Sequence, residues 1–247
     1  MRKSPRRAAT TPPGAIRAPF WDVGSATETI TILCTPGGGA KATRKILCFR
    51  ALAAPATSRK TFAMSNLTVD IRLARQDDAA DVAQVYIDSW HDTYPGVLPD
   101  ALLRAMSPKG QTARWLASIE SQGSGHWNEK VLVADSGEGI VGMSSIGRAR
   151  DRALGLDGEV FTLYVDPAFF GLGVGRALLK GAFTALRQDG MHSCVIWAHA
   201  RNHARFFYEA MGGRLIAERQ AKLMGEACPE VAFGWKTLAL VERTIAR

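Results

Sequence analysis

Three glycines at alternate positions stand where an apolar run gives way to a helical pattern: Gly171, Gly173 and Gly175. The apolar run ends at Asp166-Pro167, and the helical pattern that follows stops at Gly190. Backbone N–H groups beside glycine approach a ligand closely, and the dipole of a helix favours negative charge at its N-terminus. The stretch therefore predicts a strand, a glycine turn and a helix that together bind a phosphate-bearing ligand.

The spacing of these glycines excludes the common nucleotide fingerprints. Residues 171–176 have the sequence Gly-Leu-Gly-Val-Gly-Arg. A dinucleotide site needs G-x-G-x-x-G and an acidic residue about 20 positions later, and a P-loop needs Gly-Lys followed by Ser or Thr. A glycine turn can also be a tight connection with no ligand. The neighbouring segments must therefore show whether this turn binds one.

A second segment with polar and aromatic residues runs from Asn202 to Gly213 and predicts a short helix closed by glycines. Tyr208 lies one helical turn after Ala204, whose small side chain leaves room for a ligand. The Tyr208 phenol is either a proton donor or an interfacial aromatic with a satisfied hydroxyl. His199 and His203 are four residues apart but straddle the junction of strand and helix, so we predict no metal site.

The remaining patterns predict one mixed α/β domain over residues 67–247. The expected order is β-α-α-β-β-β-α-β-α-β-β, with about seven strands in a twisted sheet and helices on both faces. Asp77 or Asp78 is a candidate cap for the first helix, and the second runs from Asp100 to about Ile119 with a break at Pro108. The strands are expected at residues 69–73, 131–134, 140–146, 159–165, 194–198, 215–220 and 231–237.

The positive charge of the chain is concentrated in residues 1–66. They hold 11 Lys or Arg and two acidic residues, whereas residues 67–247 hold 20 basic and 21 acidic ones. We expect residues 1–66 to be a disordered basic extension, either a transit peptide or the product of a start placed too early, with Met64 as the true start. The near-neutral remainder argues against a nucleic-acid partner.

Four cysteines without C-x-x-C spacing indicate incidental thiols in a reducing compartment and favour a cytoplasmic protein. No apolar run approaches the roughly 20 residues of a membrane span, so no membrane partner is expected.

The two motifs together resemble those of the GCN5-related N-acetyltransferase (GNAT) superfamily. Tyr164-Val-Asp-Pro167 followed by Phe170-Gly-Leu-Gly-Val-Gly175 and Arg176-Ala-Leu-Leu resembles its first signature. Asn202-x-Ala204-x-x-Phe-Tyr-Glu-x-x-Gly-Gly resembles its second, and Ser89-Trp-x-x-Thr-Tyr-x-Gly-x-Leu-Pro99 is similar to the first-helix region of small bacterial members. The resemblance covers residues 67–238 and implies a GNAT-like fold.

The resemblance also implies a donor site for acetyl-CoA. Backbone amides from Gly171 to Arg176, including Leu172 and Val174, would hold the pyrophosphate. Leu163 and Val165, with Tyr164 between them, would pair with the pantetheine where a bulge separates the central strand from the next one. Phe170 departs from the family pattern, which has Gln or Arg there, and Arg176 can supply the missing charge.

The same resemblance assigns roles in acetyl transfer. Tyr208 would protonate the leaving thiolate, and Glu159, at the start of the central strand, is the candidate general base. Asn202 would bond the pantetheine, cap the helix, or do both. Trp90, Tyr94 and His199 would line the acceptor pocket, with His199 as an alternative base.

The expected function is therefore direct transfer of an acetyl group from acetyl-CoA to a primary amine in a ternary complex, with no metal. A non-catalytic acyl-CoA-binding domain of the same fold is the alternative. A third hypothesis is a protein that binds nucleic acid through its basic extension. It predicts salt-dependent nucleic-acid binding that disappears when residues 1–63 are deleted. The acceptor and the oligomeric state, with a homodimer among the options, are left open.

Overall fold

The computed structural model describes residues 67–223 and 226–238, so the extension and Met64 lie outside it. Seven strands in this part of the chain form one mixed sheet in the order β1-β2-β3-β4-β5-β7-β6. Within the described residues, β4 and β5 are the only strands that pair in parallel. The strands are β1 (Asp70–Leu73), β2 (Lys130–Asp135), β3 (Ile140–Arg148), β4 (Gly158–Val165), β5 (Cys194–His199), β6 (Arg214–Leu223) and β7 (Glu226–Trp235).

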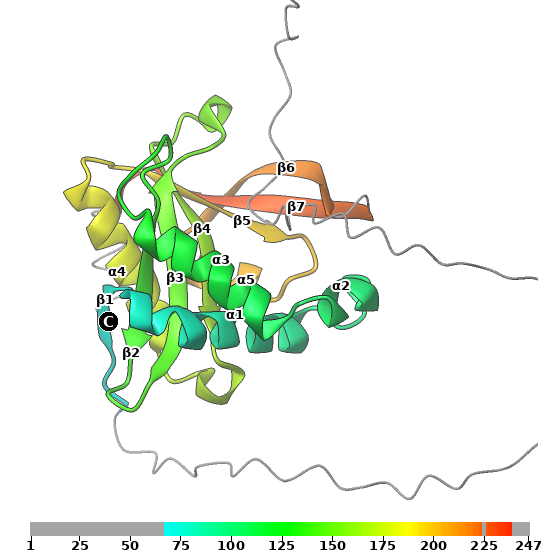
Figure 1. Cartoon of the computed structure of the whole chain (residues 1–247). Helices are drawn as coiled ribbons and strands as arrows, with labels where there is room; N and C mark the ends of the chain where they lie inside the picture. The colour runs from blue at the N-terminus through cyan, green and yellow to red at the C-terminus, as the bar shows by residue number, and fades with distance from the viewer. Residues whose placement is uncertain (1–66, 224–225, 239–247) are drawn as a thin grey trace, which may run out of the picture. The chain divides into compact units, whose positions relative to one another are not determined.

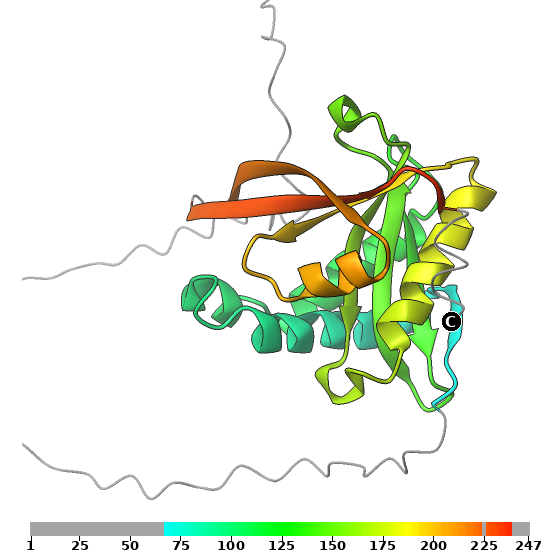
Figure 2. The ribbon, with the colours of Figure 1, turned by 180° about the vertical axis from the view of Figure 1, so that it is seen from behind.

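Helices flank both faces of the sheet, as the sequence predicted. In Figure 1, α1 and α3 lie in front of the sheet, and Figure 2 shows α4 and α5 on the opposite face. The helices are α1 (Ala79–Thr93), α2 (Asp100–Arg104), α3 (Pro108–Glu120), α4 (Val174–Gln188) and α5 (Ala204–Ala210). Pro108 divides the predicted second helix into α2 and α3, because proline fits at the first turn of a helix but not inside one.

Helix α4 is held on the sheet by an apolar stripe. Five of its side chains are completely buried: Leu178, Leu179, Ala182, Phe183 and Leu186. Burying each of the larger ones stabilises the fold by about 1.5–3 kcal/mol. The N-terminus of α4, and the glycine turn before it, are therefore fixed against the end of β4.

Two local predictions need correction. Asp78 is the N-cap residue of α1, but its side chain makes no capping hydrogen bond. It accepts hydrogen bonds from Arg72 at 2.7 and 2.9 Å instead, and these lower its pKa and tie β1 to the start of α1. The last two strands are also displaced or longer than expected, since β6 ends at Leu223 and β7 already begins at Glu226. Pro229 lies inside β7, and proline within a strand pattern argues against a strand.

The strands β4 and β5 diverge after a short ladder. They pair only from Gly158 to Val160, opposite Cys194 to Ile196. On the other side of β4, the register with β3 shifts between Ser145 and Ile146 and leaves Phe161 as the extra residue of a bulge. The bulge and the divergence expected from the family resemblance are confirmed, and they open the sheet beyond Phe161.

No helix among the described residues is long and apolar enough to cross a membrane.

Candidate active site

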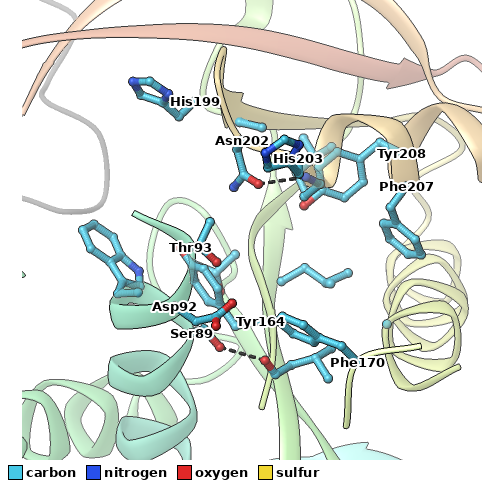
Figure 3. A pocket seen from close by; sticks show the side chains of 18 of the residues that line it. Ser89, Asp92, Thr93, Tyr164, Phe170, His199, Asn202, His203, Phe207 and Tyr208 are labelled. Carbon is cyan, nitrogen blue, oxygen red and sulfur yellow. Dashed lines mark hydrogen bonds between the residues drawn. The ribbon is translucent and has the colours of Figure 1, made fainter. Parts of the chain in front are cut away.

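A cavity of about 680 Å³ lies where β4 and β5 diverge. Its walls come from α1 and the loop after it, the glycine turn, α5 and β7. Figure 3 shows the side chains that meet there. Among the predicted site residues, the following line it: Trp90, Tyr94, Leu163, Tyr164, Val165, Phe170, Gly171, Gly173, Val174, Gly175, Arg176, His199, Asn202 and Tyr208. Leu172 and Glu159 do not.

The glycine turn forms a cradle of backbone donors. Gly171 and Gly173 have φ angles of +78° and +86°, which other residues rarely adopt, and Gly173 precedes the first residue of α4. Among the described residues, the N–H groups of Gly171, Gly173, Val174 and Gly175 make no backbone hydrogen bond. Added Cβ atoms at Gly171 and Gly173 would meet nothing within 4 Å, so the approach to these donors is open. This arrangement suits an anionic phosphate group.

Phe170, where the family pattern has a polar residue, lies beside this cradle. Its side chain is 51% exposed and contributes no charge. Arg176 lines the cavity from the first turn of α4, where a cation can face a bound phosphate. The backbone donors do not depend on the side chain at position 170, so the cradle is complete without a polar residue there.

The open edge of β4 offers further backbone groups. The Asp166 N–H donates to the Val141 carbonyl at 3.0 Å, on the β3 side. Hydrogen-bonding direction alternates along an antiparallel strand, so the backbone groups of Leu163 and Val165 face the gap. The Ser89 hydroxyl, to which the sequence analysis assigned no role, donates to the Val165 carbonyl at 2.9 Å and positions α1 along this edge (Figure 3).

Tyr208 directs its hydroxyl into the cavity (Figure 3). The ring packs against Phe207, Phe233 and Trp235, and only 4% of the residue is exposed. Within residues 67–223 and 226–238, no hydrogen bond holds the hydroxyl. Burial raises the pKa of Tyr208 well above its ordinary value, so the phenol keeps its proton at neutral pH. A protonated hydroxyl without a protein acceptor is suited to donate to a ligand.

Asn202 joins α5 to the loop after α1. Its Oδ1 accepts from the Ala204 N–H at 2.8 Å, which is the capping role predicted from the sequence (Figure 3). Its Nδ2 donates to the Tyr94 hydroxyl at 3.1 Å. Burial raises the pKa of Tyr94 to about 12. The pair fixes one side of the cavity, and one N–H of the amide is left over for a ligand.

His199 lies at the end of β5 and is 8% exposed. Its Nδ1 accepts from the Arg201 N–H at 3.1 Å, which places the proton of the neutral ring on Nε2. Burial, and then the charge of Arg201, lower the pKa of His199. The imidazole is therefore arranged as a neutral donor through Nε2, and this arrangement does not favour His199 as a base.

Glu159 lies outside the cavity and is 1% exposed. Its Oε2 accepts from the Arg150 N–H at 2.9 Å, and its Oε1 is paired with the Arg150 guanidinium. Arg150 occupies both oxygens of Glu159. The geometry therefore does not favour Glu159 as the general base, whereas it does favour Tyr208 as the acid.

Three further residues that the sequence did not indicate line the cavity on its β5 and β7 side: Trp197, Cys228 and Glu230. Glu230 lies opposite His199 in the ladder between β5 and β7. Only that register, which joins residues about 30 positions apart, brings Glu230 to the site.

Comparisons with known proteins agree with this geometry. The family model for an acetyltransferase (GNAT) domain matches residues 127–212. An uncharacterized N-acetyltransferase, YuaI of Bacillus subtilis, is 31% identical over 180 residues, which are 72% of this chain and 99% of the relative.

Solved structures share the fold. The PaiA N-acetyltransferase of Thermoplasma acidophilum, in complex with coenzyme A, is 19% identical with a TM-score of 0.51, over 66% of this chain and 98% of that one. YncA of Salmonella typhimurium, a putative acetyltransferase with its cofactor acetyl-CoA, is 20% identical with a TM-score of 0.51, over 69% and 94%. The match over nearly the whole length of YuaI, joined to the divergent strands and the glycine cradle, shows that the chain belongs to the GNAT family of N-acetyltransferases.

Proposed function

We propose that the protein transfers an acetyl group from acetyl-CoA to a primary amine by direct attack within a ternary complex. The observation that carries the proposal is the gap between β4 and β5, which has backbone donors at one end and the Tyr208 hydroxyl on its wall. The structures of PaiA with coenzyme A and of YncA with acetyl-CoA support this choice of donor.

The residues present fit such a donor. The N–H groups of Gly171, Gly173, Val174 and Gly175 would hold the pyrophosphate, with Arg176 beside them. The Leu172 N–H, also expected there, donates instead to the Phe169 carbonyl at 3.4 Å. The open edge at Leu163 and Val165 would pair with the amide groups of the pantetheine, and the leftover N–H of Asn202 is a further donor. Acetyl-CoA supplies a thioester whose carbonyl carbon accepts the amine.

The chemistry asks for little more from the protein. A neutral amine attacks, the carbonyl oxygen gains negative charge, and the sulfur leaves as a thiolate that needs a proton. Tyr208 would give that proton. Trp90, Tyr94 and His199 would form part of the acceptor pocket.

The direct test is incubation with acetyl-CoA and a panel of amines, with thiol release and the acetylated product both measured. Calorimetry with CoA tests the donor site separately. Binding of CoA without turnover of any amine would support the alternative, a non-catalytic acyl-CoA-binding domain. Absence of CoA binding would remove the basis of both.

The glycine turn yields a matched prediction. Gly171 and Gly190 have the same φ, +78°, and an added Cβ has no neighbour within 4 Å at either position. Gly171→Ala and Gly190→Ala should each cost about 1 kcal/mol of unfolding free energy, because alanine is strained in this conformation. Only Gly171→Ala should also weaken CoA binding, by roughly tenfold, since Gly171 lines the cavity and Gly190 does not. Thermal unfolding and calorimetry on both variants check this, and equal CoA affinities would contradict it.

A further inference from the structure

The side of the cavity formed by β5 and β7 carries a carboxylate with no role in holding CoA. Glu230 is 2% exposed, lies opposite His199 in the ladder, and lines the cavity with Trp197 and Cys228. Partners in a ladder project to the same face of a sheet, so Glu230 and His199 stand side by side. A buried carboxylate on a cavity wall needs a compensating partner.

Glu230 has such a partner for only one of its oxygens. Its Oε2 accepts from Arg219 Nε at 2.6 Å. Arg219 does not line the cavity, and its guanidinium lies 3.8 Å from the centre of the Trp197 ring. Throughout the described part of the chain, no hydrogen bond to Glu230 Oε1 is found. Arg219 thus fixes the carboxylate through Oε2, and Oε1 is left without a hydrogen-bond donor from the described residues.

Charge elsewhere in the cavity narrows what this oxygen can bind. Among the described residues of the lining, Arg176 is the only Lys or Arg, and it lies at the glycine turn. Asp92 is the other acidic residue of the lining, and it is exposed at the end of α1. His199 is a neutral donor, as its lowered pKa and its bond from Arg201 indicate. Arg219 is already paired with Glu230 and does not line the cavity. A carboxylate on the acceptor would therefore find no unpaired cation on this wall of the described cavity and would be costly to bury.

Many of the other residues that line the cavity are apolar or aromatic. They include Trp90, Leu98, Phe161, Trp197 and Leu223. Aromatic rings of this kind bury apolar groups and also attract a cation over their faces. The surroundings suit a ligand with a positive head and an uncharged, apolar body.

We propose that Glu230 Oε1 binds the acceptor as its ammonium form, which passes one proton to water before the neutral amine attacks, and that the acceptor is a primary amine with an apolar body and no carboxylate. This assignment rests on the proposed function, because it takes the amine to be the second substrate. It makes Glu230 a residue that determines specificity, and Arg219 the residue that positions it.

The test uses two probes that differ only by a carboxylate, 2-phenylethylamine and phenylalanine, titrated by calorimetry into the full chain saturated with CoA. We expect 2-phenylethylamine to bind at least tenfold more tightly. Glu230→Gln should weaken its binding by about 10- to 100-fold, the range of a hydrogen bond to a charged group. Equal affinities for the two probes, no binding of 2-phenylethylamine, or an unchanged affinity in Glu230→Gln would overturn the assignment.

Glu218→Gln is the matched control. It makes the same change of charge one residue before Arg219, on an exposed position of β6 outside the cavity, and should leave both affinities unchanged.

Glu230→Gln leaves Arg219 without its partner, so Glu230→Gln combined with Arg219→Gln serves as a second variant. If it binds CoA normally and still fails to bind 2-phenylethylamine, loss of the fold is not the cause; recovery of amine binding would overturn the assignment.

Turnover is measured separately, as thiol release with 2-phenylethylamine. If the protein turns over 2-phenylethylamine, Glu230→Gln should raise the KM for this amine by the factor by which it weakens binding, and should change kcat little. Amine binding that depends on Glu230 without any thiol release would leave the assignment standing and contradict the proposed transfer. Thiol release that is unchanged in Glu230→Gln would support the proposed transfer and contradict the assignment of Glu230.

Discussion

Tyr208→Phe is expected to lower kcat by about 10- to 10³-fold while the Kd for CoA stays within about twofold, the scale on which a general acid contributes. The substitution removes one hydroxyl and keeps the ring that packs against Phe207, Phe233 and Trp235. No protein group within the described residues depends on this hydroxyl through a hydrogen bond, so the unfolding free energy should change little. Single-turnover measurements with saturating acetyl-CoA would isolate the effect on the chemical step.

Tyr86→Phe is the matched control for the loss of a buried phenol. Tyr86 is 3% exposed, packs in the core between α1 and α3, and does not line the cavity. Its replacement should leave kcat unchanged. A fall in kcat of the same size in both variants would show that Tyr208 acts through packing and would contradict its role as the acid.

The pH dependence of the reaction follows from the same burial. The pKa of Tyr208 is raised well above its ordinary value, so the proton is present at every pH below that raised pKa and is lost only above it. Deprotonation of Tyr208 should therefore cause no fall in kcat between about pH 7 and pH 9. An alkaline loss of kcat in that range that disappears in Tyr208→Phe would contradict this prediction.

The parts of the site predicted from sequence are those that depend on local pattern. The positive φ of Gly171 and Gly173, the start of α4 and the capping by Asn202 are each set by a few neighbouring residues. Tyr208 reaches the cavity because it follows Ala204 by one helical turn. Local preference and helical period are readable along the chain, and the tertiary fold keeps them here.

The parts that could not be predicted depend on pairing between distant segments. Glu230 reaches the cavity only through the register of β7 on β5, and Ser89 reaches Val165 across 76 positions of sequence. The segment between β3 and β4 places Arg150 on Glu159, a contact that no local pattern indicates. A carboxylate at the start of a strand gives no sign of whether it will face substrate or an arginine. That choice is made by packing.

Arg150→Met is expected to destabilise the protein by about 3–5 kcal/mol, the cost of leaving a buried charge without its partner. Glu159 is 1% exposed, and Arg150 contacts both of its oxygens. The Arg150 guanidinium also lies 4.6 Å from the centre of the Phe161 ring, which borders the cavity. Arg148→Met, at an exposed position two residues earlier, should cost less than about 0.5 kcal/mol. Chemical denaturation of both variants measures the difference, and similar losses would contradict the prediction.

Combining Arg150→Met with Glu159→Met should restore most of that stability, because a buried ion pair can be replaced by apolar side chains at little cost. This double variant also tests whether Glu159 takes part in acetyl transfer. If Glu159 were the general base, the double variant would fold, bind CoA and lose transfer by about 10²-fold or more. We expect transfer to be largely kept, because Glu159 does not line the cavity and both of its oxygens are held by Arg150. Because Arg150 engages the Glu159 carboxylate, we expect Glu159 to stabilise the bulged strand. The proton of the incoming amine would then pass to water or to a group inside the cavity.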